Sequence, residues 1–337
     1  MSGAHTPRSR DEGGPRGEPA TTAAAAAEGQ APAGYPTPHQ VLARLGLRPL
    51  KRLGQHFLTD VHIARRIAAA CELTATTPVL EVGAGTGALT QHLIAPGRRV
   101  VAVEIDKLLA PVLAENLDGP SGLEVIQADV RTLDLAALAR ERTPDERWVF
   151  ASNVPYLLTT DLVTQILDAG PIFERAILLV QREYAARLAA QPGTETYGAL
   201  TVYVRQLAVV EHLFAVSRGC FHPIPEVESS VIRLIPRLRP AVAVRSQETM
   251  RDVVRAAFGM RRKMLGNTVA KIAAARDAAL TGGELCRRAG IDAQRRGETL
   301  DLADFAALAD ALEDVAPRPV VPAPDPAARP RMSRGDA

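Results

Sequence analysis

Long hydrophobic runs are missing from this chain of 337 residues. A helix that spans a membrane needs about 20 consecutive apolar residues, and no segment approaches that length. The first residues also lack the apolar block that a signal peptide carries. These absences exclude an integral membrane protein and a secreted one, and they predict a protein of the cytoplasm.

Cysteine is scarce as well. The chain has three cysteines, Cys71, Cys220 and Cys286, which are far apart and form neither a CxxC pair nor a cluster with histidine. An odd number of scattered cysteines argues against a disulfide framework, and their spacing does not fit a zinc site. We therefore expect buried, unpaired thiols and no metal.

Lysine is also rare, since only four of the 40 basic residues are lysine and the other 36 are arginine. The planar guanidinium group pairs with phosphate through two hydrogen bonds, which would suit an RNA-binding protein. A GC-rich genome explains the same bias, together with the many Ala, Gly and Pro residues. The arginine total alone therefore identifies no partner, and the positions of the basic residues must decide.

Composition divides the chain into four parts. Residues 1–36 and 316–337 are rich in Pro, Gly, Ala and charged residues and have almost no large aliphatic side chain, so we expect both to be disordered. With 47% apolar residues in the whole chain, the part between them can bury substantial cores. We expect an α/β domain over 37–238 and a small helical domain over 239–315.

Short β-branched runs alternate with helical stretches in the first domain. The expected strands cover residues 78–82, 99–105, 123–128, 148–152 and 176–181, with helices such as 107–116 and 160–167 between them. This alternation predicts a doubly wound, Rossmann-like α/β fold, in which helices cover both faces of a parallel sheet. Runs at 207–216 and 230–236 follow without a clear crossover helix, which indicates an antiparallel hairpin at the sheet edge.

The pattern becomes purely helical after residue 240. Helical periodicity covers residues 247–258, 261–275, 283–289 and 302–312. This change in pattern predicts a small all-helical second domain.

A glycine-rich turn follows the first expected strand. Gly83, Gly85 and Gly87 have G-x-G-x-G spacing just before a helical pattern, where glycines let the backbone approach a nucleotide-like ligand. The turn lacks the G-x-G-x-x-G run of a pyrophosphate site, and the preceding Glu81 fits the amino-acid end of S-adenosylmethionine better than it fits NAD. By itself the turn is equally consistent with a simple strand-to-helix connection.

Acidic residues end the next two strands. Glu104 could accept hydrogen bonds from two ribose hydroxyls, and Asp129 from an adenine amino group. Each alone is more often a solvated strand end. All three features fall at the carboxyl edge of the expected sheet, where open α/β sheets bind ligands, so together they predict an S-adenosylmethionine site.

The fourth strand runs into the sequence SNVPY at the same edge. The amine of a nucleobase is a poor nucleophile because its lone pair is delocalised into the ring. The side-chain oxygen of Asn153 and a backbone carbonyl of Val154 or Pro155 could accept both N–H groups and make the nitrogen pyramidal, while Tyr156 stacks on a flipped-out base. An ordinary Asn-x-Pro turn is the alternative, but the neighbouring features favour a methyl-transfer site.

Six motifs keep the order seen in rRNA adenine N6-dimethyltransferases, and the chain resembles this family over about residues 40–314. They are KRLGQHFLTD (51–60), LEVGAGTGALT (80–90), VAVEID (101–106), QADV (127–130), SNVPY (152–156) and FHPIPEVESS (221–230). The resemblance implies an enzyme that uses S-adenosylmethionine to methylate adenines of ribosomal RNA.

The same resemblance implies roles for individual residues. His56 and Leu58 would line the methionine end of the cofactor, and the remaining cofactor contacts would come from Gly83, Gly85, Glu104, Asp129 and Asn153. Asn153, Pro155 and Tyr156 would form the catalytic segment, with Phe221 holding the target adenine against Tyr156. Many members have Asn in place of His56, so the role of that side chain is open.

Branches of this family differ in substrate. One dimethylates two adjacent adenines in the 3′-terminal hairpin of small-subunit (16S) rRNA, and the other methylates large-subunit (23S) rRNA and confers macrolide-type resistance. Residues 257–267 and 289–300 look like the helical domain of the small-subunit branch. There the basic triplet Arg261, Arg262 and Lys263 could hold rRNA phosphates. We expect a monomeric enzyme that acts on the immature 30S subunit during its biogenesis.

Other functions stay open at this point. The large-subunit resistance activity is the nearest, and a non-catalytic ribosome-assembly factor is another, although the intact Asp129, Asn153, Pro155 and Tyr156 argue against it. A dehydrogenase is disfavoured by the glycine spacing.

Overall fold

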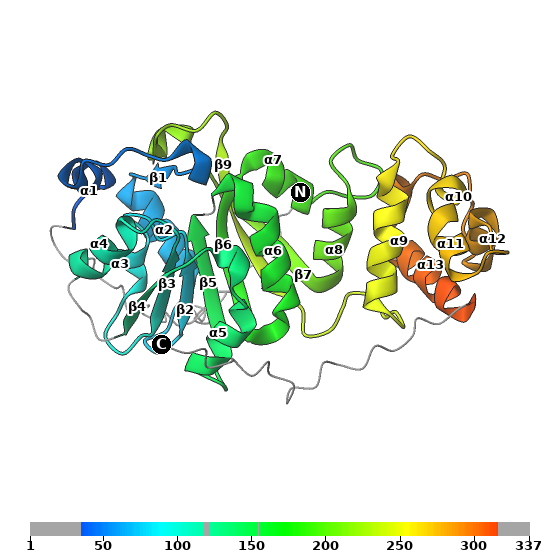
Figure 1. The fold of residues 1–337 in the computed structure, drawn as a ribbon, viewed down its shortest axis with the longest axis horizontal. Helices are drawn as coiled ribbons and strands as arrows, with labels where there is room; N and C mark the ends of the chain where they lie inside the picture. Colours follow the sequence, from blue (N-terminus) through cyan, green and yellow to red (C-terminus); the bar gives the residue numbers. More distant parts are fainter. Residues whose placement is uncertain (1–34, 118–121, 154, 316–337) are drawn as a thin grey trace, which may run out of the picture.

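The computed structural model describes residues 35–117, 122–153 and 155–315. A sheet with helices on both faces and a separate group of helices lie next to each other along the long axis of the molecule (Figure 1). The disorder expected for residues 1–36 and 316–337 concerns residues outside the described part, apart from Tyr35 and Pro36.

Seven strands form the central sheet in the described part of the chain, in the order β4-β3-β2-β5-β6-β9-β7. Neighbours from β4 to β6 are parallel, whereas β9 runs antiparallel to β6 and β7. The strands are β2 (Val79–Val82), β3 (Val100–Glu104), β4 (Leu123–Gln127), β5 (Trp148–Asn153), β6 (Phe173–Gln181), β7 (Ala208–Val216) and β9 (Ser229–Pro236). This order confirms the doubly wound α/β fold, with a switch point between β2 and β5.

The two faces of the sheet have separate apolar cores. Alternate residues of a strand point to opposite faces, so Leu80 shares a core with Ile166, while Val79 shares another with Leu93. The covering helices are α2 (Val61–Ala70), α3 (Thr90–Leu93), α4 (Leu109–Asn116), α5 (Leu135–Arg142), α6 (Thr159–Asp168), α7 (Arg182–Leu188) and α8 (Ala199–Leu207). Every residue of β2 and β3 is buried, as expected for parallel strands covered on both faces.

The chain crosses from β6 to β7 through α7 and α8, so the expectation that no crossover helix precedes this strand pair is wrong. The β-branched residues Thr201, Val202 and Val204 make α8 resemble a strand in the sequence. All three are buried in the structure, and tertiary packing outweighs their weak preference for strands. The antiparallel pairing of the last two strands is confirmed, with β7 at the sheet edge.

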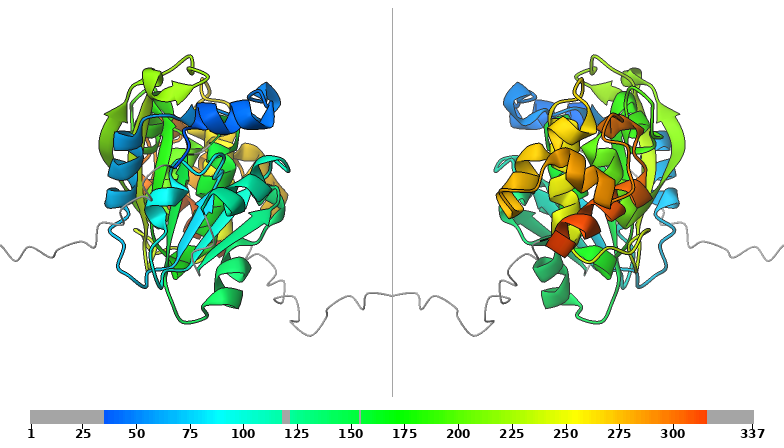
Figure 2. Two further views of the ribbon diagram at one scale, coloured as in Figure 1. Left: turned by 90° about the vertical axis from the view of Figure 1, so that its left-hand side faces the viewer. Right: turned by 90° about the vertical axis from the view of Figure 1, so that its right-hand side faces the viewer.

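The all-helical second unit is also confirmed, and its helices face the viewer in the right-hand view of Figure 2. They are α9 (Gln247–Gly259), α10 (Leu265–Thr268), α11 (Ala270–Arg276), α12 (Gly282–Arg288) and α13 (Leu302–Val315). Their core contains Phe305 and Leu285, and it includes Tyr197 and Val202 of the larger unit. Apolar contacts therefore continue across the predicted boundary at 238/239, which falls in the segment between β9 and α9.

The helix expected over 261–275 is divided into α10 and α11 and is preceded by a turn. The N–H groups of Leu265 and Gly266 donate to the carbonyls of Arg295 at 2.7 Å and Ala293 at 3.0 Å. Because a remote segment accepts these hydrogen bonds, the helix begins at Leu265 and not at Arg261.

An N-terminal arm lies at the carboxyl edge of the parallel strands, in blue in Figure 1. It contains α1 (Pro38–Leu45), the short helix η1 (Lys51–Leu53) and β1 (Phe57–Leu58), which pairs antiparallel with β8 (Phe221–His222). The Tyr35 hydroxyl, before α1, donates a hydrogen bond of 2.6 Å to the carbonyl of Thr86. Tyr35 therefore belongs to the folded part, and the extension predicted to run to residue 36 ends before it.

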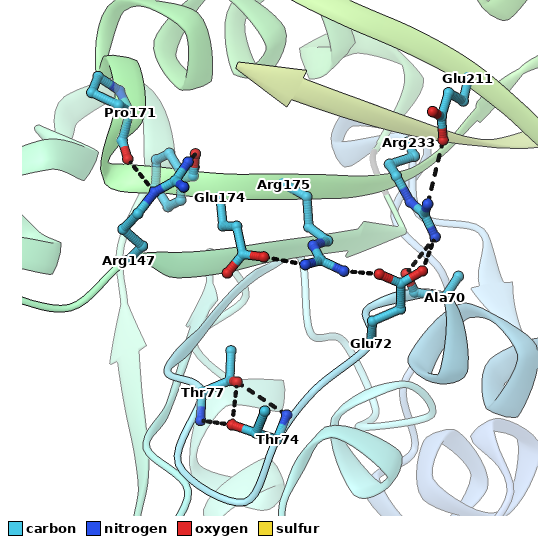
Figure 3. A network of polar contacts seen from close by, with 11 residues as sticks. Ala70, Glu72, Thr74, Thr77, Arg147, Pro171, Glu174, Arg175, Glu211 and Arg233 are labelled. Atoms are coloured by element: carbon cyan, nitrogen blue, oxygen red, sulfur yellow. Dashed lines mark hydrogen bonds and ion pairs between the residues drawn. The ribbon is translucent and has the colours of Figure 1, made fainter. Parts of the chain in front are cut away.

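A network of charged side chains joins α2 to the strands near the amino end of β6 (Figure 3). Arg233 of β9 donates from Nη2 to Oε1 of Glu72 at 2.6 Å, and Arg175 of β6 pairs with the same carboxylate. Arg233 also contacts Glu211 of β7 at 3.3 Å. Glu72 has a φ of +50°, which is uncommon for a residue with a side chain, so the two arginines stabilise an unfavourable backbone conformation.

Candidate active site

One cleft contains every residue predicted to bind the cofactor. It lies at the carboxyl ends of β2, β3 and β5. Its lining includes His56, Leu58, Gly83, Gly85, Glu104, Asp129 and Asn153, together with Pro155 and Tyr156. Doubly wound sheets bind ligands at such a switch point, which explains why residues far apart in the sequence meet here.

The glycine turn and Glu104 hold each other in place. The N–H of Gly85 donates to Oε2 of Glu104 at 2.7 Å, and the N–H of Asp106 donates to Oε1 at 2.8 Å. Burial raises the pKa of Glu104, and these two hydrogen bonds oppose the rise. A carboxylate has about four acceptor sites, so Glu104 keeps the capacity to accept hydrogen bonds from two ribose hydroxyls.

Gly87 is needed for the arm and not for a ligand. It has a φ of +86°, and a Cβ atom there would lie 2.0 Å from the hydroxyl oxygen of Tyr35. Tyr35 therefore packs directly against the glycine turn while it donates to the carbonyl of Thr86. The third glycine of the motif makes room for this contact.

Glu81 is a buried carboxyl group that lines the cleft and is 1% exposed. Its Oε2 has no hydrogen-bond partner among the described residues. Burial, reinforced by the nearby carboxylate of Glu104, raises the pKa of Glu81 to about 8. A cationic amino group is the partner that would satisfy this oxygen, so the site fits the amino-acid end of S-adenosylmethionine.

Asp129 presents its carboxylate next to the end of β4. Nη2 of Arg131 lies 2.6 Å from Oδ2, and the N–H of Arg131 donates to Oδ1 at 3.0 Å. These hydrogen bonds from Arg131 hold the pKa of Asp129 below its usual range. The group is therefore an ionised acceptor, which an adenine amino group would share with the guanidinium of Arg131.

Asn153 ends β5 in the middle of the cleft. Its side-chain nitrogen Nδ2 donates to the backbone carbonyl of His56 at 3.0 Å, which fixes the orientation of the amide. Oδ1 is then the acceptor that Asn153 offers to an incoming amine. The preceding Ser152 donates to the carbonyl of Val82 at 2.6 Å and ties β5 to β2. Val154 lies outside the described residues.

His56 connects three of the six motifs. Its ring stacks on Tyr156, with 5.7 Å between ring centroids and 28° between ring planes. Nδ1 lies 2.8 Å from the carbonyl oxygen of Pro223, so Nδ1 carries the proton and donates it to that carbonyl. The hydroxyl of Tyr156 shares a hydrogen bond of 2.8 Å with Ser229. The imidazole whose role the sequence left open thus fixes Tyr156 against the segment after β8.

Phe221 does not take the place expected for it. The prediction had this ring hold the target adenine against Tyr156, but Phe221 is 3% exposed and packs in the core with Leu58 and Ile67. The pairing of β8 with β1 places Phe221 opposite Leu58 and turns its ring inward. Within the described part of the chain, the ring that stacks on Tyr156 is His56.

The basic triplet lies in the exposed turn after α9. Arg261 donates to the carbonyls of Glu195 at 2.7 Å and Tyr197 at 3.0 Å, and it approaches Glu298 at 3.3 Å. These contacts join the two units, so part of the role of Arg261 is structural. Arg262 and Lys263 are exposed beside it.

Some contacts of the site could not be read from the sequence. They involve Tyr35, Arg131 and Ser229, which bind the glycine turn, Asp129 and Tyr156. A signal existed for the first, because Thr37 and Gln40 form a capping box, which marks the start of ordered structure. Ser229 belongs to the motif FHPIPEVESS, but only the fold brings it to Tyr156.

The fold and the cleft define an S-adenosylmethionine-dependent methyltransferase. The family model described as "Ribosomal RNA adenine dimethylase" matches residues 47–308, which is most of the chain. The chain belongs to this family.

Relatives of known name cover nearly the same length. The Ribosomal RNA small subunit methyltransferase A of Pelotomaculum thermopropionicum is 43% identical over 283 residues, which are 82% of this chain and 95% of that protein. The protein of the same name from Geobacillus thermodenitrificans is 40% identical over 81% of this chain and 94% of its own length.

Solved structures share the fold. A dimethyladenosine transferase from Plasmodium falciparum has a TM-score of 0.61 at 24% identity, covering 75% of this chain and 96% of that one. The 23S rRNA methyltransferase ErmE has a TM-score of 0.55 at 29% identity, covering 76% of this chain and 99% of that one.

Proposed function

We propose that this enzyme transfers methyl groups to N6 of two adjacent adenines in the 3′-terminal hairpin of small-subunit (16S) rRNA. The observation that carries the proposal is the position of Asn153. Its amide oxygen is offered as an acceptor in the same cleft as Glu81, Glu104 and Asp129.

Binding of the cofactor is assigned to the carboxylates and the glycine turn. Glu81 would hold the amino group, Glu104 the ribose and Asp129 the adenine, with the backbone of the turn next to the cofactor. The bound cofactor supplies a methyl group on a positively charged sulfur, which is electrophilic. The hydrogen bond from Gly85 to Glu104 keeps this half of the cleft in shape before the cofactor binds.

Activation of the adenine amine is assigned to Asn153. Its Oδ1 would accept one N–H of the amine and a backbone carbonyl near Pro155 the other, which draws the nitrogen toward a pyramidal geometry. The lone pair then leaves the ring and points at the methyl group. Because these hydrogen bonds strengthen as the nitrogen becomes pyramidal, they stabilise the transition state more than the bound substrate.

The target base is assigned to the face of the cleft at Tyr156. Its hydroxyl is fixed on Ser229 and its ring is held by His56. An aromatic ring held on two sides forms a rigid surface on which a flipped-out base can stack.

Similarity favours small-subunit over large-subunit rRNA. The two small-subunit relatives are 43% and 40% identical to this chain, whereas the 23S enzyme is 29% identical. The helical unit, with Arg262 and Lys263 on its exposed turn, would contact rRNA phosphates.

The setting of the reaction is part of the proposal. We assign the immature 30S subunit as partner, a monomer as the active form, no metal, and the cytoplasm as the location. Among the described residues, no helix combines the length and apolarity needed to cross a membrane. In the same part of the chain, no group of three or more His, Cys, Asp or Glu residues is arranged to hold a metal.

Mapping of N6-dimethyladenosine tests the substrate. Both rRNAs from a strain lacking this protein are compared with those of the parent by mass spectrometry, and purified enzyme with labelled cofactor is offered immature small or large subunits. Loss of two adjacent dimethyladenosines from 16S rRNA, restored by the purified enzyme, is expected. Loss from 23S rRNA, or no change in either, would overturn the proposal.

A further inference from the structure

Two large aliphatic side chains are exposed close in the chain to residues of the cleft. Leu157 is 72% exposed and Ile224 is 63% exposed, although each stands beside residues of the reaction centre. Most leucine and isoleucine side chains of the described residues are buried in the cores. Exposed apolar side chains at a binding site mark a surface that a partner covers.

A short series of contacts connects the segments that carry these two side chains. Leu157 follows Tyr156 and lies over Gly54 of the cleft lining, where a Cβ would be 3.7 Å from its Cδ1. Ile224 follows Pro223, whose carbonyl accepts from His56. The His56 ring stacks on Tyr156, so each aliphatic residue is the chain neighbour of a residue that contacts His56.

The backbone holds both side chains outward. Leu157 lies in the turn η3 (Tyr156–Leu158), which is closed by a hydrogen bond of 2.8 Å from the N–H of Leu158 to the carbonyl of Pro155. Ile224 lies between Pro223 and Pro225, and the two prolines restrict its backbone. The backbone at both positions is therefore restrained before RNA binds, which lowers the entropy cost of contact.

Basic side chains are exposed in the segments near this apolar pair. Lys51 and Arg52 are exposed in the segment that continues to Gly54, and Arg218 is exposed in the loop that leads to Ile224. The N–H of Arg218 donates to Glu228 at 3.0 Å, which closes that loop at its base. Positive charge around an apolar tip suits a polyanion whose interior is apolar, which describes stacked RNA.

We propose that Leu157 and Ile224 form a wedge that enters the RNA base stack as the target adenine leaves it. This inference rests on the proposed function, because it requires an adenine to be taken out of a stack and into the cleft. Flipping removes stacking interactions from the neighbouring bases. The wedge replaces these interactions with aliphatic surface, as apolar side chains do in proteins that unstack nucleic acids.

The experiment measures single-turnover methyl transfer to immature small subunits at saturating enzyme and cofactor. Leu157→Ser and Ile224→Ser are each expected to lower the rate by about tenfold, the size of one stacking interaction. The double variant is expected to lose more than either single variant. Leu157→Met keeps an apolar tip and should retain most of the rate.

Leu238→Ser is the matched control, because Leu238 is 77% exposed and lies between β9 and α9, away from the cleft lining. It should methylate at the wild-type rate. Cofactor affinity, measured by calorimetry, should stay unchanged in all variants, which excludes damage to the cleft.

The outcomes separate the inference from the proposed function. If the wild-type enzyme methylates small subunits and both serine variants match its rate, the wedge is wrong. The same assay at lower enzyme concentrations is the second test. Variants that are slow only below saturation would also overturn the wedge, because the two side chains would then only help the enzyme dock on the subunit. If the wild-type enzyme methylates no small subunit, the proposed function itself fails.

Discussion

The two edges of the central sheet hold their carboxyl groups in opposite ways. Near the start of β6, the carboxylate of Glu72 is paired with two arginines, Arg175 and Arg233 (Figure 3). In the cleft at the carboxyl edge, Glu81 is 1% exposed and its Oε2 has no partner among the described residues. A buried polar atom without a partner destabilises the fold. The paired carboxylate of Glu72 therefore contributes to stability, whereas the unpartnered carboxyl group of Glu81 is suited to bind a ligand.

The largest effect is expected at Asn153. Asn153→Ala removes the acceptor for the adenine amine, and by analogy with other positioned hydrogen-bond groups the single-turnover rate should fall by about 10²–10³. The measurement is methyl transfer to immature small subunits with saturating enzyme and cofactor. A wild-type rate would show that the SNVPY segment is a structural turn only.

The second-largest effect is expected for cofactor affinity, which should fall when Glu104 is replaced. Glu104→Ala removes the acceptor for the ribose and the partner of the Gly85 N–H. Hydrogen bonds to a charged group contribute about 1.5–3 kcal/mol, so binding measured by calorimetry should weaken by about tenfold or more. Glu72→Ala is the matched control from the opposite edge and should leave affinity unchanged. Equal losses in both variants would remove the distinction between the edges.

The pH dependence of cofactor binding should show the ionisation of the Glu81 carboxyl group. Burial raises the pKa of its carboxyl group to about 8, so the free enzyme holds a proton there at neutral pH. A cationic amino group binds the ionised form, which means that binding releases this proton. Affinity should rise with pH below about pH 8, by up to about tenfold per unit, and the rise should end where the amino group of the cofactor loses its own proton. Calorimetry in buffers of different ionisation enthalpy counts the released proton.

Glu81→Gln provides the control for that measurement. The amide cannot ionise, so proton release and the rise with pH should both disappear. A variant that keeps the wild-type pH profile would show that another group titrates.

The free energy of unfolding should fall when Glu72 is replaced by alanine. Glu72→Ala leaves Arg175 and Arg233 without this partner while keeping a side chain at a φ of +50°. Glu72 is half-exposed, so solvent screens the pairs and the loss should be about 1 kcal/mol. Glu72→Gly loses the same pairs but relieves the backbone, since the left-handed conformation costs about 1–2 kcal/mol for residues with a Cβ. Denaturant unfolding should find the glycine variant more stable than the alanine variant.

The smallest effects are expected in the exposed turn after α9. Replacing Arg262 and Lys263 by Ala should flatten the salt dependence of subunit binding by up to about 0.7–0.9 for each phosphate that is no longer neutralised. Arg261→Ala should instead lower stability, because its guanidinium joins the turn to the carbonyls of Glu195 and Tyr197. Filter binding over a salt series and thermal unfolding separate the two roles. An unchanged salt slope in the double variant would place the RNA surface elsewhere.

Much of the cofactor site could be predicted from the sequence. Gly83, Glu104 and Asp129 each lie at or just after the carboxyl end of a strand of a parallel sheet, and the carboxyl ends of such strands meet at one edge. Their proximity is a consequence of the fold class, which the alternation of short strands and helices indicates. The same reasoning placed Asn153 in the cleft, because it ends the adjacent strand.

Contacts between remote segments could not be predicted in this way. The pairing of β1 with β8 turns Phe221 into the core and leaves His56 on the ring of Tyr156. No local pattern distinguishes the inward from the outward face of a two-residue strand. The helix α8 was missed for a related reason, because packing against the second unit outweighs the preference of its β-branched residues.

The sequence by itself determined the α/β fold and the order of the site along it, since both depend on local patterns and on the geometry of parallel strands. Only the tertiary structure decided that Tyr35 fills the space over Gly87, that Arg131 shares Asp129, and that Leu157 and Ile224 are exposed. These outcomes depend on which side chain occupies a given volume or pairs with a given charge. Such choices are settled by packing and desolvation between segments, which no single stretch of sequence contains.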